Sequence, residues 1–118
     1  MKDLAPELYR QRLLIEGKYE IEVQVDTINQ FFDALLSGLG MTAAGDAVVN
    51  SSVGQGQSKN QGIEAFLPLI ESGVAIYTWQ SARFLSIIIY TCKAFEKEQA
   101  VQIVEDFFQL SQMEYKSF

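Results

Sequence analysis

Three apolar segments of strand length follow one another in the second half of this chain, and they restrict its fold more than any other feature. They span residues 63–70, 73–79 and 84–92, with only short turns between them. Strands this close in sequence pair as antiparallel neighbours, because a parallel connection needs a dozen or more residues. The third segment is apolar on both faces, which predicts helices on one side and more protein, such as another subunit, on the other. Pro68 predicts an edge or a bulge in the first segment.

The first half of the chain predicts one more strand and a helix. Residues 10–19 alternate as a strand does, with Leu13 and Ile15 on one face. Asp26 or Thr27 is the expected N-cap of the helix, and Gly38 and Gly40 are its stop signals. Its apolar stripe consists of Ile28, Phe31, Phe32, Leu35, Leu36 and Leu39.

The remaining segments complete a fold prediction. We expect a strand over 46–52, a loop rich in Gly and Gln over 53–62, and a helix over 96–113. The predicted order is therefore β-α-β-β-β-β-α. It predicts an α+β two-layer sandwich, with a mainly antiparallel sheet and two helices on one face. Residues 1–118 are expected to form one domain.

Charge and composition restrict the partners. The chain holds 15 acidic and 9 basic residues, for a net charge of −6. No basic cluster interleaves with aromatic side chains, so we expect no nucleic-acid partner, and no apolar stretch is long enough to span a membrane. The single cysteine, Cys92, is typical of a reducing cytoplasm, where we place the protein. Histidine is absent, which excludes histidine bases, triads and metal sites, and no metal is expected.

The second and third strand segments bring reactive side chains into register. A two-residue turn at Ile70 and Glu71 would place Glu64 opposite Tyr77 on one face of the sheet. Ser72 would lie beside the turn, and Cys92 would end the next strand at the same end of the sheet. The pattern therefore predicts that a carboxylate, a phenol, a hydroxyl and a thiol converge. A slip of one residue in the turn would separate them.

The same stretch resembles a known family. Residues 71–79 read Glu-Ser-Gly-Val-Ala-Ile-Tyr-Thr-Trp, and Thr91-Cys92 follows, with Cys92 thirteen residues after Trp79. Bacterial S-adenosylmethionine decarboxylases carry Glu-Ser, four residues, His-Thr-Trp, and then Thr-Cys at that distance. A Gly-Val-Ser upstream in that family falls on Gly62-Ile63-Glu64 here. The resemblance covers nearly the whole chain, with specific motifs from 62 to 92.

The resemblance implies a chemistry for each matched residue. The Glu71-Ser72 bond would be cleaved when the Ser72 hydroxyl attacks the preceding carbonyl, and Ser72 would become a pyruvoyl cofactor. Cys92 would match the acid that returns a proton after CO2 is lost. Two positions depart from the family: its histidine is Tyr77 here, and its processing serine is Glu64. Glu64 would take the role of a base, either by removing a proton directly or by deprotonating the Tyr77 phenol. Alternatively, Glu64 and Tyr77 would only hydrogen bond to each other.

Three functions remain open from the sequence. The first is a pyruvoyl-dependent decarboxylase of polyamine (spermidine) biosynthesis, acting on S-adenosylmethionine or another amino acid. The second is a catalytically inactive, unprocessed homologue that binds a ligand or regulates a partner. The third is a small dimeric module outside the family's function. Retention of Glu71, Ser72 and Cys92 favours the first, and loss of histidine favours the second. The expected partners are a small-molecule amine or S-adenosylmethionine and a second copy of the chain.

Each site residue also has a structural interpretation. Glu-Ser is common in turns, because the serine hydroxyl bonds nearby backbone. A lone cysteine such as Cys92 is usually a small core residue. Tyr77 is more often a packing residue, and Glu64 more often a solvent-exposed charge.

Overall fold

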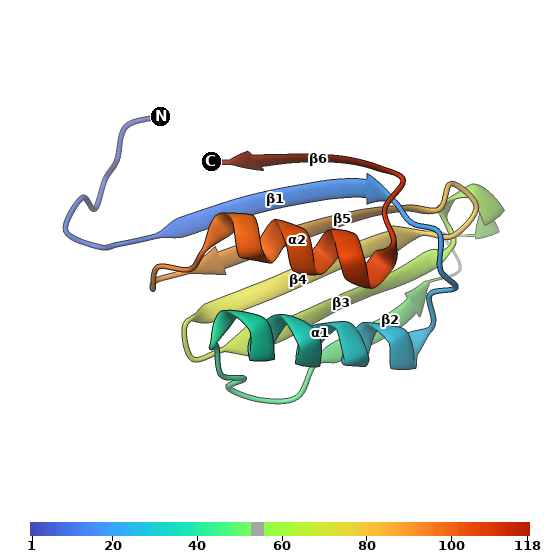
Figure 1. Cartoon of the computed structure of the whole chain (residues 1–118), viewed down its shortest axis with the longest axis horizontal. Coiled ribbons are helices and arrows are strands. Elements are labelled where there is room, and N and C mark those ends of the chain that lie inside the picture. The colour runs from blue at the N-terminus through green and yellow to red at the C-terminus, as the bar shows by residue number, and fades with distance from the viewer. Residues whose placement is uncertain (53–55) are drawn as a thin grey trace.

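The computed structural model describes residues 1–52 and 56–118, which form a six-stranded antiparallel sheet with both helices on one face (Figure 1). The elements are β1 (Gln11–Lys18), α1 (Val25–Leu39), β2 (Val48–Ser52), the short 3-10 helix η2 (Ser58–Asn60), β3 (Gly62–Leu69), β4 (Ser72–Trp79), β5 (Phe84–Thr91), α2 (Lys97–Phe108) and β6 (Gln112–Ser117). The strand order in the sheet is β2-β3-β4-β5-β1-β6. The predicted two-layer α+β sandwich is therefore confirmed.

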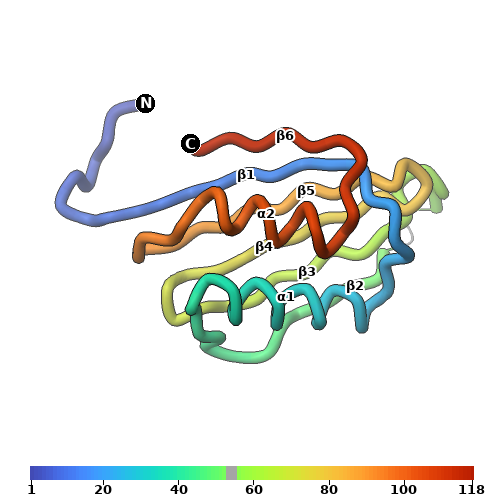
Figure 2. Tube along the Cα trace, in the orientation of Figure 1, coloured from blue at the N-terminus to red at the C-terminus, as the bar shows by residue number. Residues whose placement is uncertain are grey.

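The core lies between the helices and one face of the sheet. The stripe predicted for α1 points into it, since Ile28, Phe31, Phe32 and Leu35 are buried. α1 and α2 lie side by side on this face, roughly along the strands (Figure 2), and meet through Phe31 and Phe108, whose ring centroids are 4.8 Å apart. Strand alternation supplies the other half of the core: the buried positions include Leu13 and Ile15 on β1, Val74 and Ile76 on β4, and Leu85, Ile87 and Ile89 on β5.

Among residues 1–52 and 56–118, no helix covers the opposite face of the sheet. Its exposed side chains include the large apolar residues Val48, Phe66, Tyr77 and Tyr90. Within one chain, helices cover β5 on one face, as expected, and the cover expected from another subunit on the other face stays a prediction. No helix in the described part of the chain is long and apolar enough to cross a membrane.

The start of α1 differs from the prediction. The helix begins at Val25 with Gln24 as its N-cap, so the expected caps Asp26 and Thr27 lie inside the first turn. Thr27 still contributes to the helix start, because its Oγ1 accepts a hydrogen bond from the Gln24 N–H at 3.0 Å. The predicted stop is confirmed at Gly40, which adopts the left-handed conformation with φ 66°. A residue without Cβ takes this conformation at little cost.

The predicted helix over 96–113 is wrong at its C-terminal end. α2 stops at Phe108 because Gln109 turns left-handed (φ 52°), and β6 follows and pairs with the free edge of β1. Gly17 makes this close approach possible. A Cβ there would lie 2.7 Å from Leu110 Cδ1 and 2.8 Å from the Gln112 carbonyl oxygen. The element order is thus extended by one strand at the C-terminus.

Pro68 marks neither an edge strand nor a bulge. β3 lies inside the sheet, and its register with β4 runs without interruption from Glu64 to Leu69. Proline is tolerated because pairing with β2 ends at Phe66, before it reaches Pro68. The strand expected over 46–52 begins at Val48. The loop expected over 53–62 falls partly outside the described residues, and η2 and the first residue of β3 lie in the remainder.

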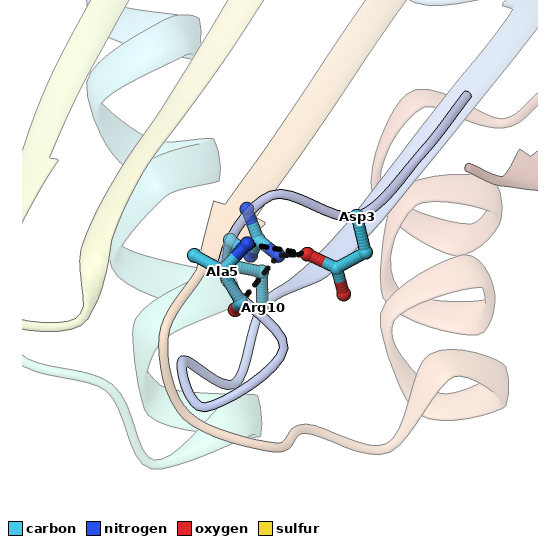
Figure 3. A network of polar contacts seen from close by, with 3 residues as sticks. All are labelled: Asp3, Ala5 and Arg10. Carbon is cyan, nitrogen blue, oxygen red and sulfur yellow. Dashed lines mark hydrogen bonds and ion pairs between the residues drawn. The ribbon is translucent and has the colours of Figure 1, made fainter.

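The N-terminal segment is held to the start of β1 by polar contacts (Figure 3). Asp3 Oδ1 accepts hydrogen bonds from the Ala5 N–H and from the Arg10 guanidinium. The Ala5 amide and then Arg10 hold the pKa of the Asp3 carboxyl below its usual value. These contacts lie at the exposed surface and away from the core.

Candidate functional site

The β3–β4 hairpin has the register that the sequence predicted. Ile70 and Glu71 form the two-residue turn, Leu69 pairs with Ser72, and Glu64 pairs with Tyr77. Ser72 is therefore the first residue of β4, and its neighbour on the other side is Thr91 at the end of β5. The turn places the Glu71-Ser72 bond at one end of the sheet, beside the point where β5 ends (Figure 1).

Ser72 has a backbone conformation that L-residues rarely adopt. Its φ is 136°, and it is half-buried between strand neighbours on both sides. A non-glycine residue in such a region costs about 1–3 kcal/mol and persists only where its surroundings impose it. Backbone strain therefore lies at the residue whose preceding peptide bond is the candidate cleavage site.

The carbonyl of that bond has a hydrogen-bond donor in place. The Cys92 N–H donates to the Glu71 carbonyl oxygen at 2.8 Å. A fixed amide at a carbonyl oxygen stabilises the negative charge that develops there when a nucleophile attacks the carbon. Cys92 itself is exposed just beyond the end of β5, so the structure does not support the interpretation as a buried core residue.

The side chain of Glu71 is also held. Its Oε1 accepts a hydrogen bond from the Thr42 backbone N–H at 3.1 Å. Glu71, Ser72 and Cys92 therefore form one group, which we call the turn site. It is built from the hairpin turn, the end of β5 and the segment after α1.

Glu64 and Tyr77 do not join the turn site within one chain. They face each other on the open face of the sheet, five residues along β4 from Ser72. At about 3.3 Å per residue this is a separation of about 16 Å along the strand. The prediction that all four groups converge is therefore wrong for a single chain, because the register that pairs Glu64 with Tyr77 also moves both away from the turn.

Sequence reasoning missed the polar row to which this pair belongs. Successive strand pairings align six polar residues across the open face, in the order Asn50, Glu64, Tyr77, Ser86, Glu16 and Glu114. Ser86 is buried and donates through its hydroxyl to Glu16 Oε2 at 2.9 Å. Finding this row required the strand order, since it depends on β1 lying between β5 and β6.

A cavity lies at the opposite end of the sheet from the turn site. Its volume is about 480 Å³, and its lining comes from the β1–α1 connection, the end of β2, the start of β3 and the β4–β5 turn. Arg83 crosses this region and donates to the carbonyl oxygens of Tyr19 at 3.2 Å and Ile21 at 2.9 Å. Burial raises the pKa of the Tyr19 hydroxyl, and the nearby Arg83 charge partly opposes that rise.

The residues of the turn site fit the precursor of a pyruvoyl group in part. A serine hydroxyl, a strained backbone conformation at Ser72 and an amide at the Glu71 carbonyl oxygen are present together. A base beside Ser72 is not supplied by Glu64 or Tyr77 of the same chain.

Comparisons with known proteins bear on the fold and the family. A family model described as S-adenosylmethionine decarboxylase matches residues 15–118. The fold is similar to the crystal structure of the adenosylmethionine decarboxylase from Aquifex aeolicus, with a TM-score of 0.73 and 13% sequence identity over 94% of this chain and 89% of that one. No curated protein matches the sequence significantly. Because the family model spans most of the chain, including the turn site and the Glu64–Tyr77 pair, the protein belongs to the S-adenosylmethionine decarboxylase family.

Proposed function

We propose that this protein is a self-cleaving, pyruvoyl-dependent decarboxylase that acts on S-adenosylmethionine or another amino acid in polyamine (spermidine) biosynthesis. The observation that carries the proposal is the hydrogen bond from the Cys92 N–H to the Glu71 carbonyl oxygen, next to the strained Ser72. Neither feature is needed for a plain hairpin turn. Both favour attack on that carbonyl in a chain of this family.

The cleavage steps use groups of the chain and one water molecule. The Ser72 hydroxyl attacks the Glu71 carbonyl carbon, the C–N bond breaks, and an ester with a free Ser72 amine results. Removal of the Ser72 Cα proton then expels the main-chain carboxylate of Glu71 and leaves dehydroalanine at position 72. Its imine tautomer takes up water and releases ammonia, so that residue 72 ends as a pyruvoyl group. That group supplies an electron sink for decarboxylation.

Two residues of this chain would act beside the finished group. Cys92 is exposed and directly follows Thr91, the cross-strand neighbour of Ser72, and its thiol would return the proton after CO2 is lost. The group expelled in the elimination is the main-chain carboxylate of Glu71. The side chain of Glu71 accepts a hydrogen bond from Thr42 through Oε1, so the new chain end is held in the fold.

We also propose that the protein works as a homodimer through the open face of the sheet. That face exposes Phe66, Tyr77 and Tyr90, and Glu64 lies too far from Ser72 of its own chain to act there. Apolar surface of this kind is typical of protein contacts. A second copy packed on the face would allow the Glu64–Tyr77 pair of one chain to serve the turn site of the other.

Intact mass under denaturing conditions tests the cleavage. Uncleaved chain is a single species near 13.3 kDa, whereas cleavage gives fragments 1–71 and 72–118, the second without a free amino terminus. Ser72→Ala is expected to stop cleavage, and its continued cleavage would show that Ser72 is not the nucleophile. Release of CO2 from labelled S-adenosylmethionine, arginine and ornithine would then separate the substrates.

Mixing two inactive variants tests the dimer. Ser72→Ala chains keep Glu64 but lack the nucleophile, and Glu64→Gln chains keep Ser72 but lack the carboxylate. Refolded together, they are expected to release a 1–71 fragment that carries the Glu64→Gln mass, although neither variant is cleaved alone. Cleavage of Glu64→Gln chains by themselves would exclude Glu64 as a necessary base.

The second candidate function is a catalytically inactive, unprocessed homologue that binds a ligand or regulates a partner. The observation that favours it is the position of Tyr77, which occupies the family's histidine position and is a weak base near neutral pH. A single uncleaved species near 13.3 kDa after long incubation would support this candidate and exclude the first.

A further inference from the structure

The segment that follows α1 runs alongside the hairpin turn and is bonded to it. The Ile70 N–H donates to the Thr42 carbonyl oxygen at 2.9 Å, and the Ala44 N–H donates to the Pro68 carbonyl oxygen at 2.8 Å. Ala43 forms an isolated antiparallel bridge with Leu69 between these two bonds. Residues 42–44 therefore act as a short strand along the end of β3.

The end of α1 determines where this segment starts. Gly40 closes the helix in the left-handed conformation, and both Gly40 and Met41 donate their N–H groups to the Leu36 carbonyl oxygen. The Met41 side chain is buried in the core. Thr42 therefore follows a residue that is fixed in the core. Its N–H donates to Glu71 Oε1 at 3.1 Å, and this donor needs little reorganisation because the backbone before it is already held.

Glu71 is consequently held at two points by different elements. Its carboxylate accepts from Thr42, after α1, and its main-chain carbonyl accepts from Cys92, after β5. Ser72 follows directly, with its φ of 136°. Without the first contact, the turn would be free to rotate the Glu71-Ser72 peptide, relax Ser72 and withdraw the carbonyl from Cys92. A strained conformation persists only where its surroundings impose it.

We propose that the Glu71 carboxylate, through the Thr42 amide, is a positioning group that keeps the Glu71 carbonyl against the Cys92 N–H and Ser72 in its strained conformation. The functional role of this contact rests on the proposed cleavage, but the contact between Glu71 and Thr42 can be tested without cleavage. Glutamine at position 71 would keep an Oε1 acceptor, whereas alanine would remove it. The two substitutions therefore separate loss of the contact from loss of the charge.

The first measurement is amide hydrogen exchange by NMR in a Ser72→Ala background, where the chain stays intact. Glu71→Ala is expected to speed exchange of both the Thr42 and the Cys92 amides about ten-fold, the size expected for one hydrogen bond to a charged group. Glu71→Gln is expected to restore most of the protection. Glu20→Ala is the matched control, because it removes an exposed carboxylate at the other end of the sheet and should leave both amides protected.

The second measurement is the rate of fragment formation with Ser72 present. Glu71→Ala is expected to slow it about ten-fold and Glu71→Gln less, at equal melting temperature. Unchanged Cys92 protection in Glu71→Ala, or equal loss in the alanine and glutamine variants, would overturn the positioning role. If the unaltered chain never cleaves, the proposed function fails, while the exchange rates still decide whether Glu71 positions the carbonyl.

Discussion

The two ends of the β3–β4 hairpin are held together by different kinds of interaction. At the turn end, main-chain amides of Thr42 and Cys92 bind Glu71. At the far end, the Thr78 hydroxyl binds both the N–H and the carbonyl of Ile63, and Gly62 packs against the Thr78 backbone. At the turn end both donors are main-chain amides, and only the Thr42 contact needs a particular side chain, the Glu71 carboxylate. At the far end both bonds need the Thr78 hydroxyl.

This difference bears on which parts of the proposed chemistry tolerate substitution. The amide of residue 92 can polarise the Glu71 carbonyl with almost any side chain at that position. Glu64 and Tyr77, near the far end, act only through their side chains, and these are the positions where the chain departs from the family pattern. Three experiments test the comparison, in order of decreasing expected effect.

Removing the amide at the turn end should have the largest effect. Cys92→Pro lacks the N–H that donates to the Glu71 carbonyl oxygen, and loss of such a donor typically slows reaction about 10²–10³-fold. Cys92→Ser keeps the amide, so it should cleave faster than Cys92→Pro and lose mainly decarboxylation. Fragment formation followed by intact mass separates the two. Equal cleavage rates for both variants would show that the amide contributes nothing.

Adding a methyl group at the far end should cost stability. A Cβ on Gly62 would lie 1.7 Å from the Thr78 carbonyl oxygen, which is backbone and has no room to move aside. Gly62→Ala is expected to lower the free energy of unfolding by about 3 kcal/mol, measured by urea denaturation. Gly45→Ala is the control, because the nearest atom there is a Pro68 side-chain carbon at an ordinary 3.6 Å. Similar losses in both variants would mean that the hairpin's far end is not closely packed.

The smallest expected effect concerns Tyr19, beside the far end. Its hydroxyl donates to the Trp79 carbonyl oxygen at 3.3 Å, and Tyr19→Phe should cost about 1 kcal/mol at neutral pH. Burial raises the pKa of Tyr19 above the usual 10.0, so its proton is held more tightly in the folded state. The resulting stability is fully present below pH 10 and declines as the pH rises through the folded pKa.

Thermal unfolding between neutral pH and the alkaline range checks this prediction. The other four tyrosines contribute equally to both proteins, so the difference between the two curves of stability against pH reports Tyr19 alone. Above the ordinary tyrosine pKa, the unaltered protein should lose stability more steeply than Tyr19→Phe. Parallel pH curves for the two proteins would show that Tyr19 ionises alike in the folded and unfolded states.

Local patterns in the sequence predicted the hairpin and its site well. Turn residues between two alternating segments gave the pairing of Glu64 with Tyr77, which the structure confirms. The stripe of α1 and its stop at Gly40 were also predictable, because helix periodicity and the left-handed cap are local properties. The C-terminal strand was not, since the predicted helix continued to residue 113 and only the free edge of β1 favours a strand there.

By itself, the sequence determined every strand and α-helix up to the start of α2, the register of the central hairpin, and the placement of Glu71, Ser72 and Cys92 at one end of the sheet. Only the tertiary structure decided that β1 lies between β5 and β6, which completes the polar row across the open face. It also decided that Thr42 and Cys92 supply amides to Glu71. The physical reason is that side-chain periodicity is encoded residue by residue. Contacts between the end of α1, the turn and the end of β5 depend instead on how separate elements pack.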